Sequence, residues 1–175
     1  MAYKIFVSHS LSDSGTAHHL KNMIEQTNNT DIYLSEDELI LGHMDDAILK
    51  EIKLCDLFLL LYSKDSHASH YVQHEVGAAR SCNKTIVALL LDENVRPDAM
   101  IKNIQYLPIY SPDKVAIEYE KLTQYINQQV EIQNQQITQI TQQDAQDTAN
   151  AALVALGAIA AAILIMYLIY KNNEN

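Results

Sequence analysis

Basic residues, glycine and cysteine are scarce in this chain of 175 residues, and each shortage argues against a class of protein. There are 12 lysines and arginines against 22 acidic residues, so the net charge is −10 and the basic surface of a nucleic-acid-binding protein is missing. The four glycines are spread along the chain and form no glycine-rich loop for phosphates. The two cysteines are too few for a disulfide framework and fit a reducing compartment. We therefore expect no nucleic-acid partner and a cytosolic domain.

What is present suits one folded domain with a short appendage. Hydrophobic residues make up 48% of the chain and charged residues 19%, which is too hydrophobic for a mostly disordered protein. The length leaves no room for two full domains. We expect a globular domain at residues 1–123, a Gln/Asn-rich helical stalk at 124–150, a transmembrane helix at 151–170 and a short tail at 171–175.

The expected transmembrane segment, residues 151–170, contains no charged residue. As a helix it would span roughly 30 Å, the thickness of a bilayer core, and it lacks the polar face that a buried helix of a small domain normally carries. Gly157 and the alanines around it offer a smooth surface for self-association in lipid. The N-terminal sequence shows no signal-peptide pattern, so we predict a C-terminal anchor with the domain on the cytosolic side. This orientation rests on the missing signal sequence and not on charge, since Lys171 is the only nearby cation.

The predicted stalk is rich in amides, because 13 of its 27 residues are glutamine or asparagine. Four apolar residues share one helical face and would allow a short coiled coil. They are Ile126, Val130, Ile137 and Ile140. Three possibilities stay open for the stalk: self-association through this face, a solvated helix, and a disordered glutamine-rich spacer.

Strand and helix patterns alternate through the first 120 residues. Strands are predicted at residues 3–8, 31–34, 56–62, 85–91 and 105–110, and helices at 12–27, 45–54, 71–81 and 112–129. This alternation predicts an α/β domain with a flavodoxin-like, doubly wound five-stranded parallel sheet. In such a sheet ligands bind beyond the carboxyl ends of the strands, in a crevice that we expect between the loops at 8–14 and 63–69.

Four segments carry a resemblance to a known family. They read IFVSHSLSD, YLSEDELILGHMDDAILKEIKLCD, LFLLLYSKDSHASHYVQHEVGAA and NKTIVALLLDE, in this order along the chain. Together they resemble a Toll/interleukin-1 receptor (TIR) domain of the bacterial type over about residues 3–122. The combination of four motifs with family-like spacing is specific, whereas any one of them alone is weak.

The resemblance implies a set of site residues. The substrate-binding residues that it implies are Phe6, Ser8, His9, Ser10, Ser69 and Tyr71. The resemblance also implies a BB loop, which in the family covers the site and mediates contacts between TIR domains. The residues that it assigns to this loop are Asp37, Glu38, Leu39 and Gly42. Glu75 matches the catalytic glutamate of the family pattern S-x-W-x-x-x-E, in which Tyr71 here replaces the tryptophan.

Glu75 is also a candidate from its position. A glutamate in the first turns of a helix is usually a solvated or capping residue. Glu75, however, follows a fully apolar strand at the expected crevice, with Ser8 and Ser69 available for ribose hydroxyls. A carboxylate of this kind can stabilise the positive charge that develops when the nicotinamide of NAD+ leaves its ribose.

The implied reaction needs no metal or organic cofactor, because NAD+ is the substrate and its nicotinamide is already a cationic leaving group. His67, His70 and His74 are close in sequence, but no cysteine or carboxylate at ligand spacing completes a zinc site. A proton-handling role stays open for His74 and for His9. The product is either ADP-ribose or a cyclic ADP-ribose isomer.

The function that the resemblance favours is NAD+ cleavage, similar to the TIR enzymes of Thoeris-type antiphage defence. The expected partners are NAD+, the membrane, further copies of the chain through the TIR domain, stalk or transmembrane helix, and a downstream effector that senses the product. The expected location is the bacterial inner membrane. The alternatives are a non-catalytic TIR scaffold, an enzyme resembling nucleoside deoxyribosyltransferases, and an effector secreted into host cells.

Overall fold

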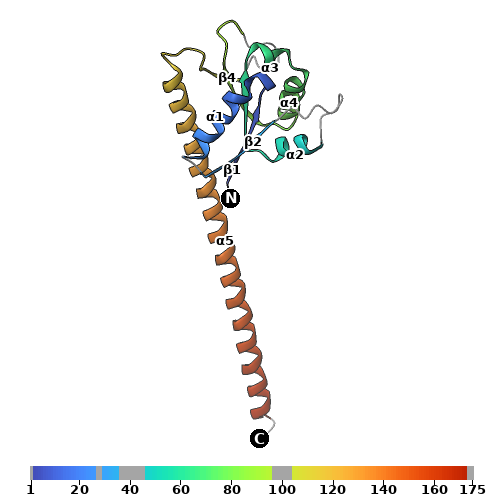
Figure 1. Cartoon of the computed structure of the whole chain (residues 1–175). Coiled ribbons are helices and arrows are strands. Elements are labelled where there is room, and N and C mark those ends of the chain that lie inside the picture. Colours follow the sequence, from blue (N-terminus) through green and yellow to red (C-terminus); the bar gives the residue numbers. More distant parts are fainter. Residues whose placement is uncertain (1, 27–28, 36–45, 96–103, 173–175) are drawn as a thin grey trace. The chain divides into compact units, whose positions relative to one another are not determined.

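A computed structural model describes residues 2–26, 29–35, 46–95 and 104–172, without the side chains of residue 155 and residues 157–172. Figure 1 shows these elements along the chain. In order they are β1 (Tyr3–Ser8), the 3-10 helix η1 (Leu11–Asp13), α1 (Ser14–Glu25), β2 (Thr30–Leu34), α2 (Asp46–Leu54), β3 (Leu57–Tyr62), α3 (Lys64–Ala68), α4 (His70–Ser81), β4 (Thr85–Leu90), β5 (Gln105–Pro108) and α5 (Val115–Asn172).

The described strands form one parallel sheet with the order β2-β1-β3-β4-β5. This arrangement confirms the five-stranded parallel sheet predicted from the alternating pattern. The chain leaves β1 toward β2 on one side and returns to β3 on the other, so the direction of winding reverses between β1 and β3. Ligands of open α/β sheets bind at such a reversal, beyond the carboxyl ends of the strands.

Helices cover the sheet on both faces and bury two apolar layers (Figure 1). One layer packs between the sheet, α1 and the first part of α5, and the other between the sheet, α2 and α4. Side chains alternate along β1, so that Ile5 and Val7 enter the first layer and Phe6 enters the second. The same alternation turns Ser8 toward α4 and the second layer.

Two short helical segments occur in the loops expected beside the crevice, and the first also overlaps the start of the helix predicted at residues 12–27. The turn η1 lies in the expected loop at residues 8–14, and α3 lies in the one at 63–69. A capping box begins α3, because the Ser63 side chain accepts from the Ser66 backbone N–H while the Ser66 side chain accepts from the Ser63 N–H. These reciprocal bonds satisfy two helix-end donors and stabilise a helix of only five residues.

Residues up to Glu131 form one compact unit, and Ile132–Asn175 form a second. Within the first unit, Ile126 is fully buried and Val130 packs against the core. Two of the four apolar stalk residues therefore belong to the folded domain. Within the second unit, Ile137 and Ile140 are exposed on the surface of α5.

No helix that the structure describes combines the length and the apolar character needed to cross a membrane. The predicted span at residues 151–170 lies in α5, but most of its side chains are outside the described set. The membrane anchor therefore stays a prediction.

Candidate active site

Glu75 is the only acidic residue on the buried stripe of α4. The N-cap of this helix is Ser69, whose side chain accepts a hydrogen bond from the Val72 N–H at 3.4 Å. The buried residues of α4 recur at helical spacing, and they are Val72, Glu75, Val76 and Ala79. Glu75 is 3% exposed. A carboxylate at such a position costs free energy unless other groups satisfy it.

Two serines satisfy this carboxylate, each from the end of a different strand. Ser8 Oγ donates to Glu75 Oε2 at 2.5 Å, and Ser35 Oγ donates to Glu75 Oε1. Both serines are buried, Ser8 as the last residue of β1 and Ser35 as the residue after β2. The carboxylate therefore lies where the carboxyl ends of β1 and β2 meet α4.

Parallel pairing explains why these two serines meet. β1 and β2 pair with Val7 opposite Leu34, so the following residues, Ser8 and Ser35, lie side by side. The Ser35 N–H also donates to the Val7 carbonyl oxygen at 3.0 Å, which continues the ladder by one residue. The register of the sheet thus places two hydroxyl groups in front of one carboxylate.

Asp13 joins the two loops that border this site. Its Oδ2 accepts hydrogen bonds from Ser10 Oγ at 2.5 Å and from Ser63 Oγ at 2.6 Å. Ser10 follows β1, while Ser63 follows β3 and caps α3. One carboxylate therefore connects the segment after β1 with the segment that leads to α4.

The other predicted substrate residues surround this centre at different depths. His9 is buried, with Nδ1 3.3 Å from the Val7 carbonyl oxygen, and the Ser10 hydroxyl is bonded to Asp13. Tyr71 is half-buried and lies one helical turn before Glu75. The predicted BB-loop residues lie outside the described part of the chain, and they are Asp37, Glu38, Leu39 and Gly42.

Phe6 lies in the core and not on an open surface. Its ring stacks between Tyr33 and Phe58, with centroid distances of 5.4 Å and 5.2 Å. Both neighbours face Phe6 directly in the register of β1 with β2 and β3. Phe6 is fully buried, and its ring packs against both neighbours.

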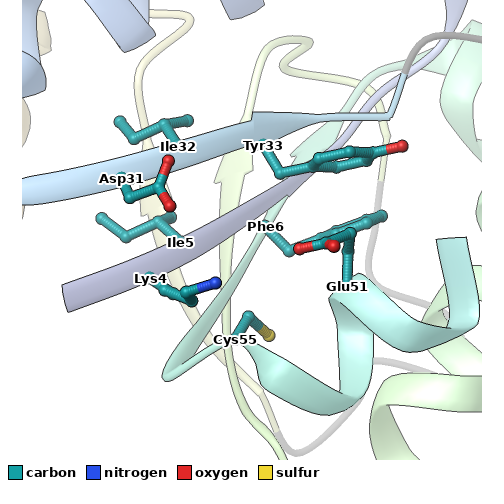
Figure 2. A pocket seen from close by; sticks show the side chains of 8 residues that line it. All are labelled: Lys4, Ile5, Phe6, Asp31, Ile32, Tyr33, Glu51 and Cys55. Carbon is teal, nitrogen blue, oxygen red and sulfur yellow. The ribbon is translucent and has the colours of Figure 1, made fainter. Parts of the chain in front are cut away.

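A pocket of about 240 Å³ opens beside this aromatic row, between β1, β2 and α2 (Figure 2). Figure 2 shows the Phe6 and Tyr33 rings stacked beside Glu51 of α2. The pocket is lined by Lys4, Ile5, Phe6, Asp31, Ile32, Tyr33, Glu51 and Cys55. Glu75 is not among these residues, so we place the candidate active site at the serine-bound carboxylate and not in this pocket.

Cys55 is a packing residue at the edge of the pocket. Burial is the main reason why the pKa of its thiol rises to about 11, and the nearby Lys84 only partly offsets this rise. The thiol donates to the Ile52 carbonyl oxygen at 3.2 Å. A protonated and buried thiol is a poor nucleophile.

The three histidines of α3 and α4 are exposed. His67 Nδ1 lies 2.7 Å from the Tyr62 hydroxyl, and His70 and His74 are exposed on α4. In the part of the chain that the structure describes, no three side chains of His, Cys, Asp or Glu are arranged to hold a metal ion.

Three residues of the site were not among the predicted site residues, namely Asp13, Ser35 and Ser63. All three lie in segments expected to border the site, because Asp13 is in the loop at 8–14, Ser63 begins the loop at 63–69, and Ser35 begins the segment at 35–44 that resembles the BB loop. The sequence does hold one signal for Ser35, because it follows the second strand as Ser8 ends the first. Only the pairing register shows that the two are neighbours. Nothing in the sequence indicates that Asp13 reaches Ser63, which lies 50 positions away.

Several solved structures are similar to this chain at low sequence identity. Among solved structures, the TIR domain of the Toll-related receptor TRR-2 from Hydra magnipapillata is similar, with a TM-score of 0.59 and 13% identity over 71% of this chain and 98% of that chain. The CMP N-glycosidase BcmB of Clostridium botulinum gives a TM-score of 0.46 and 16% identity over 68% and 97%. The TIR domains of the activated Roq1 resistosome, which directly recognises the pathogen effector XopQ, give 0.40 and 18% over 72% and 84%.

No curated protein sequence matches the chain significantly. At 13% identity, the similarity to the Hydra receptor domain shows the fold alone. The sequence profile of the TIR domain, in contrast, matches residues 5–123, which is well over half of the chain. The chain therefore belongs to the TIR domain family.

Proposed function

We propose that this protein is a TIR-domain enzyme that cleaves NAD+ at the bond between nicotinamide and ribose. The observation that carries the proposal is the Glu75 carboxylate, buried at the carboxyl ends of β1 and β2 and bonded by Ser8 and Ser35. β1 is one of the two strands between which the winding reverses, and a buried, oriented carboxylate beside such a reversal is a typical catalytic arrangement. Membership of the TIR family directs the choice of substrate toward NAD+.

The chemistry follows from the charge of the substrate. The bond between ribose C1′ and the nicotinamide nitrogen breaks, both electrons stay on the nitrogen, and neutral nicotinamide leaves. The positive charge then develops on the ribose, where the Glu75 carboxylate stabilises it. The electrostatic effect is strong because the site is shielded from water.

The reaction is completed by a nucleophile. Water adds to C1′ and loses one proton, so that NAD+ and water yield ADP-ribose, nicotinamide and a proton. If a group of the same nucleotide adds instead and loses its proton, the product is a cyclic ADP-ribose isomer. Neither route requires an oxidant or a reductant.

Residues around the carboxylate would bind the substrate. A carboxylate oxygen accepts more than one hydrogen bond, so Glu75 can bind ribose hydroxyls in addition to the serines. Tyr71, half-buried and one turn before Glu75, would pack against the nicotinamide or the ribose. His9 and Ser69 would contribute at the edges of the site.

We place this reaction on the cytoplasmic side of the bacterial inner membrane, where residues 151–170 would anchor the chain. Anchoring confines the chains to two dimensions and raises their effective concentration, which favours self-association. In this setting the enzyme would serve antiphage defence, either by producing a nucleotide signal for an effector or by depleting NAD+. Removal of residues 151–175 should move the protein from the membrane fraction to the soluble fraction.

The decisive experiment is NAD+ turnover by the full-length protein in detergent and on liposomes, with products separated by chromatography and identified by mass spectrometry. We expect the wild type to consume NAD+ and Glu75→Gln to lose at least about 100-fold in rate. Glu25→Gln on the surface of α1 removes the same charge away from the site and should behave as wild type. Equal turnover by wild type and Glu75→Gln would reject the proposed role of Glu75.

A non-catalytic, membrane-anchored TIR scaffold is the second candidate. The observation that favours it is the burial of Glu75, which is 3% exposed and accepts a hydrogen bond from a serine at each carboxylate oxygen. A scaffold would show no turnover even when crowded on liposomes, and Glu75→Gln would still self-associate normally. Nucleosides should be assayed beside NAD+, because their selective cleavage would point to an enzyme resembling nucleoside deoxyribosyltransferases.

A further inference from the structure

We infer that Ser35 is a positioning residue that holds the Glu75 carboxylate in its catalytic orientation. The inference rests on the proposed function and adds a residue that neither the sequence motifs nor the family pattern assigned to catalysis. Its basis is the hydrogen bond from Ser35 Oγ to Glu75 Oε1, opposite the bond from Ser8 Oγ to Oε2.

A carboxylate bound at one oxygen can still rotate about its terminal bond, because that torsion is soft. Donors at both oxygens, from two different strands, fix the plane of the group. Ser8 supplies one donor from β1 and Ser35 supplies the other from the end of β2. The orientation of Glu75 therefore depends on both serines together.

Ser35 is itself held firmly enough to act as an anchor. Its side chain is buried, and its backbone N–H donates to the Val7 carbonyl oxygen at 3.0 Å. Val7 is fully buried and lies in β1, which has a neighbouring strand on each side. A catalytic group that is supported from a rigid sheet keeps its geometry better than one supported from a free loop.

The two serines differ in what they can do during the reaction. Ser8 belongs to the predicted substrate-binding segment after β1, where ribose hydroxyls would compete for the same carboxylate oxygen. Ser35 binds the opposite oxygen and can retain its bond when the substrate is present. We assign Ser35 to positioning and Ser8 to the side on which the substrate binds.

The test compares variants of the full-length protein in the NAD+ assay. Ser35→Ala should lower kcat by about 10- to 100-fold, the range expected for one lost hydrogen bond to a charged group, while KM changes by less than about 3-fold. Ser35→Thr keeps the hydroxyl and should restore kcat to within about 3-fold of wild type. This split between kcat and KM, with rescue by threonine, is not expected of a general loss of folding.

Thr30→Val is the matched control, because it removes a buried hydroxyl from the first residue of β2, the strand that Ser35 follows, without changing the shape of the side chain. Among the described residues, Thr30 Oγ1 has no hydrogen-bond partner. Thr30→Val should retain the wild-type kcat. Equal kcat values for Ser35→Ala and Thr30→Val, with an active wild type, would overturn the inference.

A double-mutant cycle measured by urea unfolding tests this inference separately from the proposed function. Ser35→Ala is introduced into the wild type and into Glu75→Ala, and the urea midpoint of unfolding is measured for all four proteins. The substitution should lower the midpoint clearly more in the wild type, because Glu75→Ala already lacks the acceptor of the hydrogen bond. Equal shifts in both backgrounds would overturn the contact between Ser35 and Glu75. A wild type without NAD+ turnover would instead overturn the proposed function, and the cycle would still decide whether Ser35 holds Glu75.

Discussion

Ser8 and Glu75 are joined by a hydrogen bond of 2.5 Å, although 67 positions separate them in the sequence. Ser8 ends β1, and Glu75 lies in the second turn of α4. Because both side chains are buried, losing this bond costs more free energy than losing an exposed bond would, although Ser35 still donates to Glu75. The pair therefore links the geometry of the proposed catalytic carboxylate to the stability of the domain.

Ser8→Ala tests the functional side of this link. We expect the rate of NAD+ cleavage to fall by about 10- to 100-fold, since one charge-assisted hydrogen bond to Glu75 is lost. Initial rates across a range of NAD+ concentrations measure the effect. The control is Ser81→Ala, which removes an exposed hydroxyl from the last residue of α4, the helix that carries Glu75, and should leave the rate unchanged. A Ser8→Ala rate equal to that of the control would show that the bond is not needed for catalysis.

Asp13→Ala should loosen the connection between the segments after β1 and β3. Two hydroxyl groups lose their acceptor, so we expect the free energy of unfolding to fall by roughly 1–3 kcal/mol. Urea denaturation followed by circular dichroism gives this value. Asp113→Ala removes an exposed aspartate and should change stability by less than about 0.5 kcal/mol. If both variants unfold at the same midpoint, the bridge through Asp13 contributes nothing to stability.

Phe6→Leu separates packing from substrate binding. The ring stacks on Tyr33 and Phe58, so its loss should reduce the free energy of unfolding by about 1–3 kcal/mol. Because the ring is fully buried, KM for NAD+ should change by less than about 3-fold in the folded variant. A large rise in KM with unchanged stability would instead assign Phe6 to direct substrate contact.

Cys55 should resist thiol reagents in the folded protein. Burial raises the pKa of its thiol from about 9 to about 11, so at pH 8 almost none of it is the reactive thiolate. We expect iodoacetamide to modify only the half-buried Cys82 in the native state and both cysteines in urea. Peptide mass mapping identifies the modified residue. Rapid native modification of Cys55 would contradict its buried position.

The same pKa shift predicts a dependence of stability on pH. The folded protein holds the Cys55 proton more tightly than the unfolded chain does, so this contribution to stability is fully present below pH 9 and is lost as the pH rises toward 11. The free energy of unfolding of Cys55→Ala should therefore fall less than that of the wild type over this pH range. Chemical denaturation of both proteins at pH 8, 9 and 10 measures the difference, and parallel curves would rule out the linkage.

The short helix α3 could not be predicted from the local sequence pattern. Its five residues carry no apolar periodicity, and the sequence reasoning predicted a loop there. The capping box between Ser63 and Ser66 forms the helix, and Asp13 from a distant loop adds a bond to Ser63. Such a segment depends on individual hydrogen bonds that a periodicity analysis does not detect.

The sheet, the helices that cover it and the choice of Glu75 as a candidate residue could all be predicted from the sequence alone. Apolar runs such as Leu57–Tyr62 and the helical spacing of apolar residues depend only on which side chains must leave water. The folded structure alone shows that Ser8 and Ser35 share one carboxylate and that Asp13 joins two loops. Those contacts depend on strand register and loop closure between distant residues, which the local pattern of a sequence does not contain.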